Sequence, residues 1–395
     1  MRIGMILDKT FPPDSRVENE AISLIEAGHE VFLFCLYYGD QKAIEVINGI
    51  NVRRFKSNTL EYKLSALAYT VSVYQRLMRP KIKKFIHDNE IEAIHIHDMA
   101  IAEAVFKVNR NINLPVTLDL HENRPAIMRH YGHVKSLKGR LLIDPDKWEK
   151  KQQQLVQAAD HIIVVTEEAK QGVLEYGSKK PDQIVVVPNT IHPDIYLQYE
   201  IDQEIIKKYE GKEVMLYLGD TGLRRGTDTA VRAMTILKEK VPNAILVLVG
   251  NNSAEDHVLK ALIQELGLED VVFMEGWKDV SLFPSYVEAA SVCISPLKRN
   301  LHHDTTFANK IFQYMAMGKP VVVSDSTAQA NVIRAEDCGL VHEAENHGDL
   351  AEKLFDVLKN KEEAKRLGDN GKEAVLDRWN WKVTSRELIN LYDKL

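Results

Sequence analysis

Residues 301–325 read LHHDTTFANKIFQYMAMGKPVVVSD, a polar loop followed by a short helical pattern and then by a β-branched strand. Asn309 is placed to cap that helix, Gly318 to end it, and Val321 to Val323 to form the strand. In an open α/β sheet, such a junction lies at the carboxyl ends of the strands, where ligands bind. Because a helix N-terminus attracts anions, the junction predicts a diphosphate site.

Short apolar segments alternate with helical patterns along the chain, in two successive series. Their unbroken apolar character is typical of parallel strands covered on both faces. We therefore predict an α/β protein with two doubly wound, Rossmann-like domains that face each other across a cleft. The expected strands are Arg2–Leu7, Glu30–Leu36, Ala93–His97, Val116–Leu120, Ile162–Val165 and Ile184–Val187 in the first half, and Val214–Leu218, Ala244–Val249, Val271–Met274, Val292–Ser295, Val321–Ser324 and Gly339–Val341 in the second.

The length of 395 residues exceeds that of one typical core and suits two domains. We expect an N-terminal domain over residues 1–190 and a polar, proline-marked linker over 191–212. A C-terminal domain would follow over 213–378. The amphipathic segment 379–395 would return as a helix to the first domain.

Composition describes an ordinary globular protein, with 45% hydrophobic residues, 27% charged residues and a formal charge of -6. This balance argues against a nucleic-acid partner. Three widely spaced cysteines in apolar segments indicate buried thiols in a reducing compartment. The N-terminal MRIGMILDK lacks the features of a signal peptide, and the longest apolar segments fall far short of the ~20 residues of a membrane span. A cytoplasmic location is expected, including the inner face of the membrane.

Six segments follow one another in this order over nearly the full length: FPPDSRVENEAISLIEAGHEV, LDLHENRP, VVTEEAK, VVPNT, LYLGDTGLRRGTDTAVRAM and KIFQYMAMGKPVVVSD. Together they resemble the retaining glycosyltransferases of family 4, which include the glycosyl transferases group 1 and have the two-domain GT-B fold. The resemblance implies that the N-terminal domain, residues 1–190, binds the acceptor and that the C-terminal domain, residues 213–378, binds the nucleotide-sugar. The resemblance implies transfer of a sugar from a nucleotide-activated donor, with retained anomeric configuration and without a required metal or cofactor. A UDP-sugar is favoured over a GDP-sugar as the donor.

The loop after the strand ending at Leu218 is the first expected donor site. Glycines such as Gly219 let the backbone approach a phosphate, and a guanidinium neutralises a leaving diphosphate. Arg225 matches the basic residue that the family has before the last glycine of this loop, and Arg224 is placed to assist it. An arginine that the family often has after the first glycine is replaced here by Asp220. The alternative is that both arginines form a solvated helix start.

The second expected donor site is the helix that begins near Asn309. Lys310 and Gln313 are three residues apart and share a helix face. The family has two glutamates with seven residues between them, at the positions of Thr305 and Gln313. An amide can hydrogen-bond ribose hydroxyls, and a threonine can hydrogen-bond the sugar but cannot ionise. Asp304 is the candidate to replace the missing acid.

Residues after other strands complete the expected site. The resemblance places His121 near the transferred sugar as a hydrogen-bond partner, with Glu122 and Arg124 as acceptor contacts. Arg16 follows Asp14 and Ser15, the candidates to cap the first helix. It would contact the phosphate or the acceptor, or form a surface salt bridge. Gly276 lies where the fold would place the nucleotide base, and the neighbouring Trp277 would contact the base or pack in the core.

Two metal-like patterns are weak. Asp144 and Asp146 spell a DxD motif, but Pro145 between them indicates the start of a helix. His302 and His303 lack a third ligand at a useful spacing, so no metal site is expected.

Basic residues gather in RLMRPKIKKF and RHYGHVKSLKGR, either as solvated helix faces or as a surface for anionic lipid headgroups.

The sequence therefore predicts a metal-independent hexosyltransferase that moves a sugar from a nucleoside-diphosphate sugar to a hydroxyl of a glycan or lipid-linked acceptor, in cell-surface polysaccharide or glycolipid biosynthesis. Replacing Arg225 and Lys310 should abolish turnover. Two alternatives remain open: a GT-B sugar-nucleotide epimerase or hydrolase, and a nucleotide-sugar-binding module whose catalysis is impaired by the missing glutamates. A nicotinamide-dependent enzyme is disfavoured because the first strand leads into LDKTFPPDS, without GxGxxG.

Overall fold

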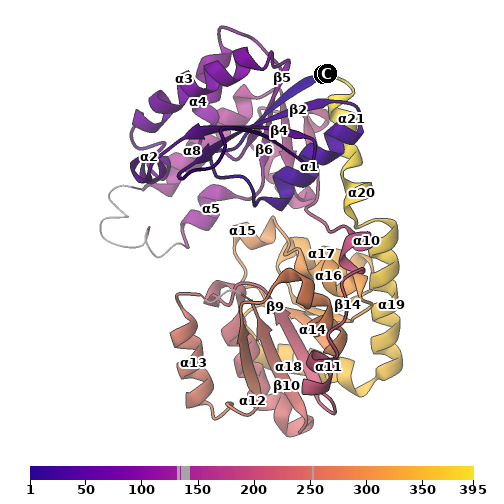
Figure 1. Ribbon diagram of the computed structural model, residues 1–395. Helices are drawn as coiled ribbons and strands as arrows, with labels where there is room; N and C mark the ends of the chain where they lie inside the picture. Colours follow the sequence, from indigo (N-terminus) through magenta and orange to yellow (C-terminus); the bar gives the residue numbers. More distant parts are fainter. Residues whose placement is uncertain (131–133, 135–142, 251–252) are drawn as a thin grey trace. The chain divides into compact units, whose positions relative to one another are not determined.

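The computed structural model describes residues 1–130, 134, 143–250 and 253–395. The chain divides into two compact units, each with its own sheet, and each is described by itself (Figure 1). The first comprises Met1–Asn189 and Ser385–Leu395, and the second comprises Thr190–Thr384. The expected linker over 191–212 lies within the second unit, where it contains helices α10 (Pro193–Tyr196) and α11 (Gln203–Lys208).

The first unit contains an eight-stranded sheet in the order β3-β4-β2-β1-β5-β6-β7-β8, parallel except for β3. Its strands are β1 (Arg2–Ile6), β2 (Glu30–Tyr37), β3 (Ile44–Ile47), β4 (Ile50–Lys56), β5 (Ala93–His97), β6 (Val116–Leu120), β7 (His161–Val164) and β8 (Ile184–Val186). After β2 and the β3-β4 hairpin on one side of β1, the chain crosses to β5 on the other side. The carboxyl ends of β1 and β5 therefore form the topological switch point at which doubly wound sheets bind ligands.

Helices cover both faces of this sheet. On one face α1 and the returning helix α21 lie together, and α3, α4 and α8 cover the other (Figure 1). Asp14 caps α1 by accepting a hydrogen bond from the backbone N–H of Val17 at 3.2 Å, as the sequence predicts. The helices are α1 (Ser15–Glu26), α2 (Thr59–Ser65), α3 (Val73–Asp88), α4 (Ala102–Asn109), α5 (Arg124–Met128), α8 (Pro145–Ala158), α9 (Glu167–Leu174) and α21 (Arg386–Tyr392), with a 3-10 turn at Pro181–Gln183.

The second unit contains a six-stranded parallel sheet in the order β11-β10-β9-β12-β13-β14. Its strands are β9 (Glu213–Leu218), β10 (Ala244–Val249), β11 (Val272–Gly276), β12 (Val292–Ser295), β13 (Val321–Ser324) and β14 (Gly339–His342). The chain leaves β9 toward β10 and β11 and returns to β12 on the other side. The switch point of this sheet is therefore at the ends of β9 and β12.

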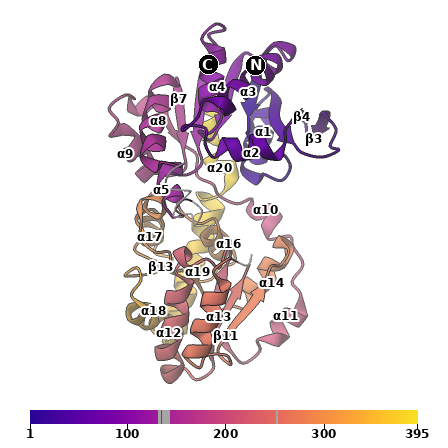
Figure 2. The same ribbon diagram turned by 90° about the vertical axis from the view of Figure 1, so that its left-hand side faces the viewer.

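Alternate residues of β9 pack into two separate cores. Val214, Leu216 and Leu218 face a core shared with α14, α16 and α19, whereas Met215 and Tyr217 face one shared with α12, α13 and α18 (Figure 2). The helices are α12 (Thr227–Lys240), α13 (Asp256–Glu265), α14 (Phe283–Ala289), α15 (Leu301–Asp304), α16 (Lys310–Ala316), α17 (Thr327–Ala335), α18 (His347–Lys359), α19 (Lys361–Asp377) and α20 (Trp381–Thr384), with 3-10 turns at Leu223–Arg225 and Val280–Leu282.

All twelve predicted strands are present, each within two residues of its predicted ends. The hairpin of β3 and β4 was not predicted. Segment 379–395, expected as one helix, divides between the units, because α20 belongs to the second and α21 to the first. None of the helices in the described ranges combines the length and apolar character needed to cross a lipid bilayer.

Candidate functional site

In the second unit, two glycines bring the backbone close together around the switch point. Gly226 has φ +75°, and a Cβ there would lie 1.7 Å from the carbonyl oxygen of Pro296, just after β12. At Gly250, after β10, a Cβ would lie 2.1 Å from the carbonyl oxygen of Gly219. Only glycine fits either position. The backbone segments around the end of β9 therefore pack too closely for a side chain at either position.

Lys310 is the first residue of α16, and its side chain reaches the end of β9. Its Nζ lies 3.4 Å from the centroid of the Tyr217 ring and would lie 3.4 Å from a Cβ on Gly219. This Nζ is buried and has no hydrogen-bond partner among the described residues. Burial, reinforced by the positive charge of Arg225, lowers the pKa of Lys310 well below its usual value. A buried ammonium beside bare backbone is suited to receive an anion.

Arg224 and Arg225 lie on the 3-10 turn that follows β9, and Asp220 lies between them. Its Oδ2 is 3.4 Å from Arg224 Nη2 and 3.8 Å from Arg225 Nε, while its Oδ1 accepts a hydrogen bond from Gly222 N at 3.0 Å. The arginine side chains are only about one-quarter exposed. When Lys310 is protonated, these four side chains, three cations and one carboxylate, sum to 3 − 1 = +2.

Thr305 and Asp304, the two candidates to contact the sugar, form hydrogen bonds with other protein groups. The Thr305 hydroxyl donates to the carbonyl oxygens of Leu301 and His302, at 2.8 and 3.3 Å. Asp304 does not replace the missing acid, because its Oδ1 accepts hydrogen bonds from the backbone N–H and the hydroxyl of Thr327 at the start of α17, at 2.9 and 3.0 Å. The geometry thus speaks against both residues as direct sugar contacts.

The rest of the predicted donor set is only partly brought together. Asn309 stands at the start of α16, but its side chain makes no capping hydrogen bond, which corrects that prediction. Gln313 lies half-buried three residues after Lys310 on the same helix. Gly276 accepts a hydrogen bond from Gly250 N at 2.9 Å, next to the site. Trp277 is 65% exposed, so the prediction that it packs in the core is wrong. Its contact with the nucleotide base remains a prediction.

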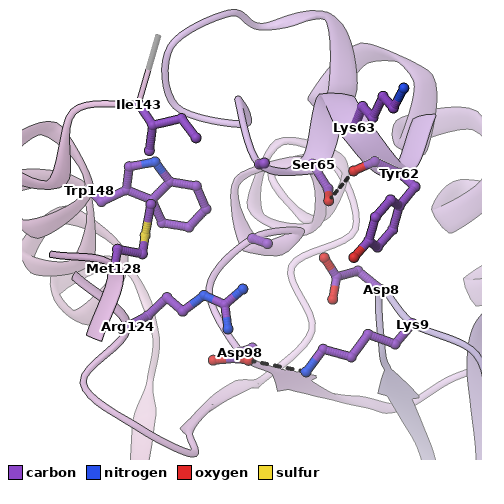
Figure 3. Close-up of a pocket in the computed structure, with 12 residues that line it drawn as sticks. Asp8, Lys9, Tyr62, Lys63, Ser65, Asp98, Arg124, Met128, Ile143 and Trp148 are labelled. Carbon is purple, nitrogen blue, oxygen red and sulfur yellow. Dashed lines mark hydrogen bonds and ion pairs between the residues drawn. The ribbon is translucent and has the colours of Figure 1, made fainter. Parts of the chain in front are cut away.

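In the first unit, a pocket of about 580 Å³ opens at the switch point between β1 and β5. Asp8 and Lys9 follow β1, and Asp98 follows β5 directly. Figure 3 shows Asp8 and Arg124 pointing toward the middle of the pocket from opposite sides, with Lys9 reaching toward Asp98. Met128, Ile143 and Trp148 lie on the same side of the pocket as Arg124, across from Asp8 and Lys9, and are largely buried. Of the predicted acceptor contacts, Arg124 lines this pocket, and its Nη1 lies 3.0 Å from Glu122 Oε1.

His121, directly after β6, is the outermost member of a buried charged network. Its Nε2 lies 2.6 Å from Asp119 Oδ2 and 3.1 Å from His97 Nδ1. His121 is 16% exposed, whereas Asp119 and His97 are fully buried. Burial lowers the pKa of His121, but the Asp119 carboxylate outweighs this and raises it overall. The ring is therefore held in place from behind and partly open to solvent.

Arg16 corrects a prediction. Its side chain is only 5% exposed, so it forms neither a surface salt bridge nor an open contact site. Its guanidinium pairs with Asp119 at 3.0 Å and Glu20 at 2.9 Å, and donates to the carbonyl oxygen of Val187 at 3.1 Å. It thereby ties α1 to the ends of β6 and β8. We infer that Arg16 supports His121 through Asp119.

His95 completes the network on the inner side. Its Nε2 lies 3.3 Å from Glu20 Oε2, and its Nδ1 shares a 2.9 Å hydrogen bond with the hydroxyl of Tyr392 on α21. Burial opposes protonation, but hydrogen bonds to Asp119 and Glu20 raise the pKa of His95 to about 9. Burial and the neighbouring charge of His95 lower the pKa of His97 to about 4. Protonated His95 and Arg16 thus balance the two carboxylates.

Four of these residues form the one group in the described residues whose geometry resembles a metal site. Ligand atoms of Glu20, His95, His97 and Asp119 lie within 4.8 Å of one another. However, the guanidinium of Arg16 already pairs with both carboxylates. A divalent cation would have to displace or adjoin this fixed positive charge, so the donor set fits a metal poorly. The predicted DxD motif is a helix cap, since Asp144 accepts from the N–H of Asp146 at 3.0 Å.

This network predicts that its own contribution to the stability of the first unit is largest near pH 6.5. Because the folded pKa of His95 is raised from 6.5 to about 9, its contribution is complete below pH 6.5 and is lost as the pH rises through 9. Because the folded pKa of His97 is lowered to about 4, stability falls as the pH drops from 6.5 toward 4. On the acidic and on the alkaline side of this maximum, which form the two limbs of the curve, the free energy of unfolding falls by about 3 kcal/mol. Urea unfolding followed across this pH range measures both limbs, and His95→Gln should flatten the alkaline one; an unchanged alkaline limb in that variant contradicts the assignment.

Sequence reasoning missed several residues that the structure brings together. Asp8, Lys9 and Asp98 were not singled out, although each follows a predicted strand at the edge where ligands bind. His95, His97 and Asp119 interrupt otherwise apolar strands, and polar residues within a buried strand indicate a network of partners. His302 and His303 are buried side chains of α15 rather than loop residues. Of the basic segments, RLMRPKIKKF lies on α3, while residues 131–133 and 135–142 of the other region lie outside the described residues.

Comparison with known families agrees with this architecture. The model of Glycosyltransferase Family 4 matches residues 15–195, and that of Glycosyl transferases group 1 matches residues 198–374. The first match lies in the first unit except for residues 190–195, the second lies in the second unit, and together they cover most of the chain. The chain therefore belongs to the family 4 type of GT-B glycosyltransferases.

Curated relatives are distant. The chain is 23% identical to spore coat protein SA of Bacillus subtilis, over 47% of this chain and 49% of that protein. It is 21% identical to a D-inositol 3-phosphate glycosyltransferase of Nocardiopsis dassonvillei, over 88% of this chain and 81% of that protein. The matched segment thus spans about half the length of several curated relatives.

Solved structures show the same fold. Sucrose-phosphate synthase from Thermosynechococcus elongatus superposes with a TM-score of 0.81 at 20% identity, covering 100% of this chain and 98% of that one. Anabaena Alr3699/HepE in complex with UDP superposes with a TM-score of 0.74 at 15% identity and covers 100% of both chains. These likenesses establish two Rossmann-like domains of the GT-B type.

Proposed function

We propose that this protein is a retaining hexosyltransferase that moves a sugar from a nucleoside-diphosphate sugar to a hydroxyl of a glycan or lipid-linked acceptor. Lys310 is the observation that carries the proposal. Its buried Nζ lacks a hydrogen-bond partner among the described residues and adjoins the bare backbone of Gly219. A buried cation of this kind needs an anion, and the diphosphate of the donor supplies one.

The residues around Lys310 have clear roles in this proposal. Arg225 and Lys310 hold the diphosphate. Arg224, which pairs with Asp220 in this structure, assists them by contacting the phosphate. Because negative charge grows on the diphosphate as the sugar leaves, these cations stabilise the transition state more than the ground state. The net charge of +2 around the site lets the protein do this without a metal. His121 then provides a hydrogen bond to the transferred sugar.

The donor base and the pathway are part of the same proposal. A UDP-sugar is the favoured donor, and Anabaena Alr3699/HepE, of the same fold, has structures in complex with UDP and with UDP-glucose. A mannosyltransferase of Mycobacterium tuberculosis among the relatives is GDP-mannose-dependent, so a GDP-sugar is the competing donor. Cell-surface polysaccharide or glycolipid synthesis would follow. The exposed Arg76, Lys83 and Lys84 of α3 support contact with the anionic inner face of the membrane.

Two alternative functions compete with this proposal. Thr305 and Asp304 are committed to helix contacts, which favours a module that binds the donor without turnover. An epimerase or hydrolase would use the same donor site without an acceptor. The pocket between β1 and β5 favours the transferase, because a donor-only enzyme has no need of a second, sugar-sized cavity.

The proposal is tested by a donor panel. UDP-, GDP-, ADP- and dTDP-sugars are compared by thermal shift with EDTA present, and the donor that binds is then incubated with the enzyme alone and with acceptors. One donor should stabilise the protein by about 2.7 kcal/mol at 100 times its Kd. Transfer with retained configuration, measured by NMR of the product, supports the proposal. Binding without any turnover favours the module, turnover without an acceptor favours the hydrolase or epimerase, and no shift with any donor contradicts all three.

A further inference from the structure

Asp220 places a carboxylate in the corner of the second unit that the proposed function assigns to the donor diphosphate. It directly follows Gly219 at the end of β9. The hydroxyl of Tyr217 donates a hydrogen bond to the backbone carbonyl oxygen of Asp220 at 2.7 Å, and Lys310 Nζ lies over the ring of the same tyrosine. Residue 220 is therefore fixed close to the buried cation on which the proposed function rests.

Two carboxylates occupy successive backbone N–H groups in the loop after β9. Asp220 Oδ1 accepts a hydrogen bond from Gly222 N at 3.0 Å. Oε2 of Glu255 accepts one from the next backbone group, Leu223 N, at 2.8 Å. Successive backbone N–H groups in a turn are also a common binding site for phosphate. The side chains of Asp220 and Glu255 thus take the place that an anion would take on this loop.

The second oxygen of Asp220 faces the arginines. Asp220 Oδ2 lies 3.4 Å from Arg224 Nη2 and 3.8 Å from Arg225 Nε. Its side chain is 39% exposed, so solvent and an incoming ligand both have access to it. A phosphate that approaches the arginines must displace the carboxylate or share the cations with it at the expense of like-charge repulsion. In either case Asp220 opposes anion binding at this corner, and the opposition grows with the charge of the anion.

The donor and the product of the proposed reaction differ in that charge. The bridging diphosphate of a nucleoside-diphosphate sugar carries two negative charges. The free nucleoside diphosphate has a terminal phosphate whose second pKa is about 6, so at pH 7.5 it carries nearly three. The base and the ribose are the same in both molecules. A fixed negative charge beside the phosphates therefore weakens binding of the product more than binding of the donor.

We infer that Asp220 is a specificity-determining residue that favours the nucleoside-diphosphate sugar over the free nucleoside diphosphate and so limits retention of the product. This inference rests on the proposed function, because it concerns the phosphate contacts of that reaction. Glu255 acts in the same direction through Leu223. The cations of the corner outnumber these carboxylates when Lys310 is protonated, so stabilisation of the departing diphosphate is reduced rather than abolished.

Binding of paired nucleotides to the full-length protein tests the inference. UDP, GDP, ADP and dTDP are each compared with a corresponding nucleotide-sugar by isothermal calorimetry at pH 7.5, with EDTA present. Asp220→Asn keeps the oxygen that accepts from Gly222 N and removes the charge. It should tighten binding of the nucleoside diphosphate about tenfold and of the nucleotide-sugar about fivefold, because each ligand charge adds a small interaction of similar size. Adding Glu255→Gln should extend both changes in the same sense.

Asp202→Asn is the matched control. Asp202 is exposed at the start of α11 in the same unit, and its Oδ1 accepts a hydrogen bond from the backbone N–H two residues later, that of Glu204, at 2.9 Å. The substitution therefore removes one negative charge from the same kind of turn as Asp220→Asn. It should leave the affinities for both members of each nucleotide pair unchanged.

Salt separates an effect of charge from a change of shape. At 1 M salt, where the Debye length is about 3 Å, the tenfold difference between wild type and Asp220→Asn should shrink to about twofold or less. In steady-state kinetics, the inhibition constant of the product should fall more than the KM of the donor. A difference in affinity that does not respond to salt would overturn the inference, because the substitution would then act by moving the loop.

The remaining outcomes distinguish this inference from the proposed function. Equal or weaker binding of the nucleoside diphosphate by Asp220→Asn would overturn the inference alone, since Asp220 would then only position the arginines. Tightening of the nucleotide-sugar by as much as its diphosphate would also overturn it. Absence of nucleotide binding by both wild type and variant would overturn the proposed function as well. If Asp220→Asn does not fold, Asp220→Ser takes its place, because a serine hydroxyl also accepts from the N–H two residues later.

Discussion

Arg225→Ala combined with Lys310→Ala is expected to lower the rate of sugar transfer about 10⁴-fold or more while the protein stays folded. Each group stabilises charge that develops on the departing diphosphate, and loss of one such contact typically reduces turnover about 10²- to 10³-fold. The measurement is steady-state kinetics with the donor that the panel identifies. Donor affinity should fall as well, because both side chains also contact the ground state.

A matched control removes the same charges elsewhere. Arg232 on α12 and Lys260 on α13 are exposed, so Arg232→Ala with Lys260→Ala changes the net charge of the second unit equally. This control should retain activity within about twofold of wild type. Full activity in the Arg225 and Lys310 double variant would contradict the placement of the diphosphate at the end of β9.

Lys310 should also destabilise the protein when no donor is bound. Burial lowers its pKa, so the folded state holds its proton less tightly than the unfolded state, and stability rises with pH toward 10.5. Lys310→Met should therefore remove this pH dependence and raise the unfolding free energy by about 1–3 kcal/mol. A lower melting temperature for Lys310→Met would mean that Lys310 has a stabilising partner and is not waiting for an anion.

Much of the fold follows from local sequence rules. The strands are apolar on both faces, and this pattern predicts parallel strands. Asp14 and Asp144 cap helices, as their positions predict. The β3-β4 hairpin was missed although a signal was present. Asn48 and Gly49 both have positive φ, at 50° and 83°, and an Asn-Gly pair between β-branched segments is a strong hairpin signal. Its strands are half-exposed, so they lack the apolar pattern of the others.

The site was less predictable because side-chain partners come from distant parts of the chain. Arg16 meets Asp119 across 103 residues, and His95 meets Tyr392 across 297 residues. No local pattern specifies such pairs. Thr305 was assigned by position against a family motif, whereas its hydroxyl is satisfied within α15. Motif position therefore does not predict which side chains already have hydrogen-bond partners in the folded protein.

Asp119→Asn is the second change with a large expected effect. The variant leaves Arg16 and protonated His95 facing only Glu20, inside a region with almost no solvent access. Breaking a buried ion pair by removing one partner typically costs about 3–5 kcal/mol. Urea unfolding of the full-length protein should show this loss in the transition that reports the first unit. Asp182→Asn, on an exposed turn of the same unit, is the control and should leave that transition unchanged.

A double variant decides whether the network serves stability or the placement of His121. Arg16→Met with Asp119→Leu removes both charges, so much of the stability lost in Asp119→Asn should return, since apolar replacements of buried pairs are often neutral. Activity should not return, because His121 loses the carboxylate that lies 2.6 Å from its Nε2. A double variant that regains both stability and turnover would assign the network to folding alone. Recovery of stability without turnover would show that Asp119, despite its burial, is needed to hold the His121 ring in place for the proposed transfer.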